Sequence, residues 1–96
     1  MRREEAIEIL AALKPELQAC FGVRHIGVFG SVARDEARED SDVDVVVDMP
    51  PVDLFTMVHL TQLLEEKLKE DVDVVRDRAD LQPRLRKWIS REAFYI

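Results

Sequence analysis

The stretch that decides the fold runs from Gly30 to Asp44 and reads GSVARDEAREDSDVD. It follows an apolar run that ends at Phe29, and it leads into a second apolar run at residues 45–47. This order predicts a strand, a turn onto a short helix, and a second strand. Because side chains alternate along a strand, Asp42 and Asp44 are expected to leave the same face, about 6–7 Å apart along the backbone.

The two ends of this stretch carry complementary chemistry. Two carboxylates on one face repel each other unless a cation lies between them, and hard oxygen ligands of this kind suit Mg²⁺ or Mn²⁺. At the other end, the Gly30-Ser31 turn offers free backbone N–H groups at a helix start, which favours an anion such as phosphate. Together the two ends predict metal-assisted chemistry on a nucleotide.

Length and composition limit the classes of protein to consider. The 96 residues predict one domain, 1–96, and the net charge of −6 argues against general affinity for nucleic acid or an anionic membrane. Cys20 is the single cysteine, so an internal disulfide is excluded and a cytoplasmic location is expected. No apolar run approaches the roughly 18 residues that a membrane span needs.

The remaining elements follow from periodicity and punctuation. Three- and four-residue apolar steps predict a helix over residues 2–20 with a break at Pro15, and they place Cys20, Met57 and Trp88 in the core. The other expected elements are a strand at 23–29, a short helix capped by Ser31, a strand at 42–48, a helix from the N-cap Asp53 to about 69, a strand at 71–75, a helix at 81–91 and an edge strand at 94–96. This order predicts an α/β fold, a small mixed sheet of about three to four strands flanked by about four to five helices.

Other phosphate and metal motifs do not fit. Gly22 and Gly27 have the spacing of the P-loop glycines, but Val28 occupies the position of the required lysine. Acids at 40, 42 and 44 imitate the start of a calcium-binding loop, yet Val45 replaces its glycine and Pro51 its bidentate glutamate. The pattern that remains is Gly-Ser, ten residues, Asp-x-Asp.

This pattern resembles the minimal nucleotidyltransferases of the DNA polymerase β superfamily. The resemblance rests on Gly30-Ser31, on Asp42-Val43-Asp44, and on the acidic strand 72–75 after a long helix. It implies that Gly30 and Ser31 hold the phosphates of ATP and that Asp42 and Asp44 coordinate two Mg²⁺ ions. Asp73 would complete the metal site and accept the proton of the attacking hydroxyl. Asp71 lies on the same face of its strand, so the choice between the two remains open.

The same resemblance implies a partner. In this family a small HEPN protein, often a ribonuclease toxin, accompanies the nucleotidyltransferase, which acts as antitoxin by transferring AMP from ATP to a toxin tyrosine. Two alternatives remain: a non-catalytic antitoxin that neutralises the partner by binding it, and nucleotidyl transfer to a small molecule. No direct nucleic-acid or membrane partner is expected.

Overall fold

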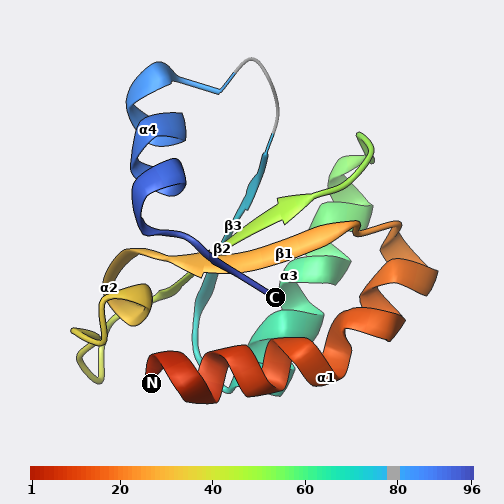
Figure 1. Ribbon diagram of the computed structural model, residues 1–96. Helices are drawn as coiled ribbons and strands as arrows, with labels where there is room; N and C mark the ends of the chain where they lie inside the picture. The colour runs from red at the N-terminus through yellow and green to blue at the C-terminus, as the bar shows by residue number, and fades with distance from the viewer. Residues whose placement is uncertain (78–80) are drawn as a thin grey trace.

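The computed structural model describes residues 1–77 and 81–96. Within them the chain forms four helices and four strands in alternating order (Figure 1), which confirms the predicted α/β architecture. The elements are α1 (Arg3–Phe21), β1 (His25–Phe29), α2 (Gly30–Ala33), β2 (Val43–Asp48), α3 (Leu54–Leu68), β3 (Val72–Arg76), α4 (Pro83–Glu92) and β4 (Phe94–Tyr95).

The strands form one mixed sheet in the order β3-β2-β1-β4. β2 is antiparallel to β1 and parallel to β3, and the short β4 pairs antiparallel with the other edge of β1. α3 supplies the crossover that a parallel pair requires. Figure 1 shows α1 and α3 against one face of the sheet and α4 against the other.

Two apolar clusters fill the two sides of the sheet. The larger joins α1 and α3 to residues that alternate along the strands, among them Ile26, Val28, Val43, Val45 and Val47. The smaller lies under α4 and consists of Phe29, Val46 and Ile89, with half-buried neighbours that include Val75. Because the valines of β2 divide between the clusters, the acids that alternate with the larger cluster must share the face that α4 covers.

The predicted break at Pro15 is wrong, because α1 continues through it without interruption. Pro15 lies on the exposed side of the helix, where water can satisfy the carbonyl that loses its N–H partner. Buried Ala6, Leu10, Leu13 and Leu17 hold the opposite side against the core. None of the described helices is long and apolar enough to cross a membrane.

The prediction that Cys20, Met57 and Trp88 lie in the core is wrong for two of the three. Met57 packs against the larger cluster, as expected, but Cys20 and Trp88 are exposed. Cys20 falls in the last turn of α1, where the helix ends at Gly22 in the left-handed conformation with φ 71°. Trp88 retains 40% of its surface, although its ring contacts the buried Phe29 in a T-shaped arrangement.

The start of α3 confirms the predicted N-cap, and it provides a first test. Asp53 Oδ1 accepts a hydrogen bond of 2.8 Å from the Thr56 backbone N–H, and hydrogen bonding by Thr56 lowers the pKa of the Asp53 carboxyl. Asp53→Ala is therefore expected to lower the melting temperature by about 4 °C at pH 7. Asp53→Asn should keep the cap, because asparagine caps equally well.

The pH dependence separates these two variants. A lowered pKa means that the stabilisation by Asp53 is fully present above the pKa of the unfolded chain and is lost as pH falls through the folded value. In thermal melts from pH 7 to pH 2, the melting temperature of the wild type should therefore fall relative to that of Asp53→Asn, because only the wild type loses the stabilisation by ionised Asp53. Equal melting curves for Asp53→Ala and wild type would contradict the capping role.

Candidate active site

One row of residues crosses the sheet and carries two of the predicted carboxylates. Phe29 at the end of β1 lies opposite Asp44, and Asp44 lies opposite Asp73 in the parallel register with β3. Gly30 and Ser31 follow Phe29 directly, so the turn into α2 begins beside Asp44. The structure thus brings together the turn and the acids that the sequence separates by up to about forty positions.

Asp44 and Asp73 lie on the face of the sheet that α4 covers. They share the alternation of Val46 and Val75, which pack under α4, while the intervening residues face the larger core. Asp42 lies two residues before Asp44, at the entrance of β2. Asp42 and Asp73 are exposed and Asp44 is half-buried, so the three acids border solvent at the rim of the sheet.

Asp44 is the electrostatic centre of this group. Burial raises the pKa of its carboxyl above the usual value, and the negative charges of Asp73 and, less strongly, Asp42 raise it further. The positive charge of Arg34 acts in the opposite direction and lowers the pKa of Asp44. The carboxylates therefore repel one another across β2 and β3, and a cation among them would relieve that repulsion.

The donor set fits a hard divalent cation. Carboxylate oxygens are the ligands that Mg²⁺ prefers, and the repulsion at Asp44 is the cost that such an ion removes. In residues 1–77 and 81–96, however, no three acidic, histidine or cysteine side chains stand close enough together to form a finished metal site. Metal binding therefore requires small side-chain rotations, which the exposure of Asp42 and Asp73 permits.

Gly30 makes room for the Asp44 carboxylate. Its φ of 72° lies in the left-handed region, which side chains other than glycine rarely adopt. A Cβ added at Gly30 would overlap Asp44 Oδ2 and lie 3.1 Å from Asp44 Cγ. The position therefore requires glycine for two independent reasons, its backbone conformation and the close approach of the carboxylate.

Ser31 differs from its predicted role as an N-cap. α2 begins one residue earlier, at Gly30, and its N-cap Phe29 makes no side-chain hydrogen bond. Ser31 therefore occupies the first turn of the helix, half-buried, and its side chain does not cap the helix. Because α2 is a single turn, any phosphate there would be held by individual N–H and hydroxyl groups and not by a helix dipole.

The two candidate third carboxylates occupy different positions. Asp73 lies within β3, opposite Asp44, and its charge acts on Asp44. Asp71 precedes the strand, where its carbonyl oxygen accepts a 2.8 Å hydrogen bond from Val43 N–H. Asp71 is not among the groups that shift the pKa of Asp44. The geometry therefore favours Asp73.

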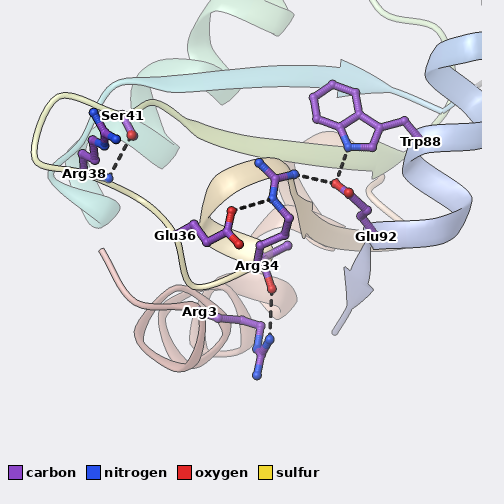
Figure 2. A network of polar contacts seen from close by, with 8 residues as sticks. Arg3, Arg34, Glu36, Arg38, Ser41, Trp88 and Glu92 are labelled. Atoms are coloured by element: carbon purple, nitrogen blue, oxygen red, sulfur yellow. Dashed lines mark hydrogen bonds and ion pairs between the residues drawn. The ribbon is translucent and has the colours of Figure 1, made fainter.

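Sequence reasoning missed Arg34, which joins the candidate site to α4. Figure 2 shows its guanidinium between two carboxylates: Nε donates to Glu36 at 3.2 Å and Nη1 donates to Glu92 at 2.8 Å. The Trp88 indole N–H donates to the same Glu92 carboxylate. The available signal was the position of Arg34, a cation three residues after Ser31 in a predominantly acidic segment.

Trp88 packs beside this network. Its ring meets Phe29 edge to face, with 5.3 Å between centroids and an interplanar angle of 89°. Phe29 is the strand neighbour of Asp44, so α4 rests directly on the row that carries the acids.

Comparison with known proteins agrees with this geometry. A family model described as "Polymerase beta, Nucleotidyltransferase" matches residues 11–96. The chain belongs to this family. It is therefore an enzyme of the nucleotidyltransferase class, and its fold is the minimal form of the family.

Individual relatives of this nucleotidyltransferase extend the comparison. The protein adenylyltransferase MntA of Thermococcus cleftensis is 45% identical over 94 residues, which cover 97% of this chain and 94% of that one. A solved structure provisionally assigned as a minimal nucleotidyltransferase is 38% identical, with a TM-score of 0.80 over 98% of this chain and 95% of that one.

Two solved toxin–antitoxin complexes share the fold at lower identity. One was solved with AMP-PNP, and its matching chain has a TM-score of 0.70 at 23% identity over 99% of this nucleotidyltransferase and 72% of that chain. The other contains a tri-AMPylated HEPN toxin of Shewanella oneidensis with its MNT antitoxin, with a TM-score of 0.67 at 22% identity over 99% and 71%.

Proposed function

We propose that this nucleotidyltransferase is a magnesium-dependent protein adenylyltransferase that moves AMP from ATP onto a tyrosine hydroxyl of a HEPN-family partner and thereby acts as an antitoxin. The observation that carries the proposal is the place of Asp44, whose carboxylate lies against Gly30 and within electrostatic reach of Asp73 and Asp42. The name of the Thermococcus relative supports the activity, and the contents of the two toxin–antitoxin complexes support the donor and the partner class.

The chain's own residues divide the work of an in-line displacement. The Gly30 and Ser31 N–H groups and the Ser31 hydroxyl hold the terminal phosphates, so that the α-phosphorus lies beside Asp42 and Asp44. Asp73, on the exposed edge strand, accepts the proton of the attacking tyrosine hydroxyl as pyrophosphate leaves. Magnesium ions held by Asp42, Asp44 and Asp73 would neutralise the charge of the triphosphate and acidify the hydroxyl.

The direct test is co-expression with a HEPN-family protein, followed by intact mass spectrometry of that protein. Addition of one or more AMP groups by the wild type, and none by Asp42→Ala, is the expected result. Neutralisation of the toxin by Asp42→Ala without added AMP would instead assign the antitoxin effect to binding alone.

The third carboxylate gives a sharper prediction, because the chain contains its own control. Asp73→Asn is expected to lower the rate of AMP transfer about 10²–10³-fold, since it removes a proton acceptor and a charged ligand. Asp71→Asn changes an equivalent side chain two residues away and should keep the rate within about twofold of wild type. Transfer from α-labelled ATP measures both variants, and the reverse ranking would assign the role to Asp71.

Arg34 should control the acid side of the pH–rate profile. Its positive charge lowers the pKa of Asp44, so Arg34→Ala should raise that pKa and move the acid limb of the profile to higher pH. Arg38→Ala is the matched control, because Arg38 is an exposed arginine of the same segment and does not act on Asp44. Unchanged acid limbs in both variants would show that Arg34 has no electrostatic influence on the reaction.

A further inference from the structure

One side of α4 carries three cations and a tryptophan in a continuous stripe. Arg84, Lys87 and Arg91 recur at steps of three and four residues, which places them along one side of the helix with Trp88 among them. With Glu92 they line an open cavity of about 530 Å³. These four residues, Arg84, Lys87, Trp88 and Arg91, are called the α4 stripe below.

The positive charge of the α4 stripe is not balanced within the described chain. Its three cations are exposed, and none forms an ion pair with an acid among residues 1–77 and 81–96. Glu92 lines the same cavity, but its carboxylate already accepts hydrogen bonds from Arg34 and from Trp88. In a protein of net charge −6, the stripe is therefore a local surface suited to an anion.

The α4 stripe borders the candidate active site without sharing its residues. Trp88 packs on Phe29, whose strand partner is Asp44, and Glu92 binds the Arg34 side chain that acts on Asp44. The cavity is lined by residues of α4, and the residues assigned to phosphate and metal lie outside its lining. The stripe is thus placed to hold a second anionic group beside the reacting one.

We propose that the α4 stripe docks the acceptor protein, by binding an acidic segment that flanks the hydroxyl to be modified. This inference rests on the proposed function, because it names a feature of the acceptor. Arginine and tryptophan are the side chains that most often dominate binding energy at protein interfaces. Unpaired surface cations accelerate the approach of an acidic partner and fix its orientation, so docking here would present the hydroxyl to the carboxylate row.

Size and charge favour an acidic protein segment over a nucleic acid. The stripe runs from Arg84 to Arg91, eight residues of helix, so it is about 10 Å long and matches a few residues of extended peptide. Nucleic-acid interfaces bury a larger, basic surface, whereas the net charge of this chain is −6 and repels a long polyanion.

Synthetic peptides test the docking surface directly. Two fluorescein-labelled probes share a central tyrosine; aspartates and glutamates flank it in one, and asparagines and glutamines in the other. Fluorescence anisotropy without ATP should show binding of the acidic probe, weakening as salt is raised, and no binding of the neutral probe. Arg84→Gln/Lys87→Gln should weaken binding of the acidic probe about fivefold.

Two further variants control for net charge and for folding. Lys67→Gln/Lys69→Gln also removes two positive charges, but from the end of α3, against the opposite face of the sheet, and it should bind the probe as the wild type does. The charge-preserving exchange Arg84→Lys/Lys87→Arg should restore binding to within about twofold. An equal loss in both glutamine variants would overturn the proposal, because general charge would then explain binding.

Other occupants of the stripe give distinct results. A loss of affinity for fluorescent ATP in Arg84→Gln/Lys87→Gln would assign the stripe to the donor nucleotide and overturn the proposal. Tighter binding of labelled oligoadenylate than of the acidic peptide, lost in the same variant, would assign it to RNA. If the wild type binds the acidic peptide but transfers AMP to no acceptor, the proposed function is contradicted and docking is not. If the wild type transfers AMP but Arg84→Gln/Lys87→Gln binds the acidic peptide as well as the wild type does, docking is contradicted and the proposed function is not.

Discussion

Asp44→Asn is expected to abolish AMP transfer and, at the same time, to raise the melting temperature of the ligand-free protein. Activity should fall at least about 10³-fold, because asparagine cannot provide the charge that holds a divalent cation at the α-phosphate. Stability should increase because the half-buried Asp44 carboxylate is repelled by Asp73 and Asp42, and asparagine has no charge to repel.

The pH dependence of this stability gain follows from the raised pKa of Asp44. A raised folded pKa means that ionised Asp44 costs folding free energy at neutral pH. This cost begins to fall as pH drops through the folded pKa, and it is gone below the pKa of the unfolded chain. The advantage of Asp44→Asn in thermal melts should therefore be largest near pH 7 and shrink in acid. A variant that is inactive and also less stable would contradict the repulsion at Asp44.

Asp48→Asn is the matched control, on the same strand and the same alternation. Hydrogen bonds from Arg24 and then His25 lower the pKa of Asp48, so its charge stabilises the fold above the unfolded pKa, and this contribution is lost as pH falls through the folded pKa. Asp48→Asn should thus lower the melting temperature slightly and leave AMP transfer unchanged. Opposite changes in melting temperature for Asp44→Asn and Asp48→Asn, four residues apart, would identify Asp44 as the aspartate whose charge serves the reaction.

Gly30→Ala is expected to reduce AMP transfer about 10²-fold, which is the loss that a displacement of about 1 Å causes in a positioned group. The new methyl group would overlap Asp44 Oδ2, so the carboxylate must rotate away from its place at the start of β2. The left-handed backbone adds a conformational cost of about 1–2 kcal/mol, because alanine disfavours positive φ.

Gly22→Ala separates the two effects at Gly30. Gly22 has nearly the same backbone angle, φ 71° against 72°, but a Cβ there would meet Pro50 Cδ at an ordinary 3.5 Å. The two variants should therefore share the loss of stability that comes from φ, while only Gly30→Ala loses activity. Chemical denaturation measures the stability of both variants, and transfer from α-labelled ATP measures their activity. An equal loss of activity in Gly22→Ala and Gly30→Ala would refute the steric role of Gly30.

Much of the fold follows from local rules that the sequence displays openly. The apolar run at residues 45–47 predicted the strand, which the structure has at Val43–Asp48, and Asp53 predicted the start of α3, because each depends only on neighbours in the chain. Pro15, in contrast, was predicted to break α1. Tertiary packing of the buried stripe overrides the missing hydrogen bond, and packing of that kind is invisible to a local rule.

In the candidate site, too, the sequence predicted what depends on neighbours in the chain and missed what depends on distant residues. The sequence grouped Gly30, Ser31, Asp42 and Asp44, and the structure places Gly30 directly beside Asp44, with Ser31 next in the chain. The roles of these residues stay predictions. What the sequence did not reveal is the junction of Arg34 and Glu92, which lie 58 residues apart. Trp88 was assigned to the core from its apolar character, although a partly exposed ring that contacts the core on one side has the same periodicity as a buried one.

The register between β3 and β2 depends on one small side chain, that of Val75. Asp71 and Asp73 are two positions apart, so a two-residue register slip would keep valines towards the larger core and still set an aspartate opposite Asp44. The slip would, however, move Asp73 to the place of Val75, under α4 and against apolar neighbours. Val75 therefore selects which aspartate faces Asp44, and an acid at that position would leave the strand with two nearly equivalent alignments.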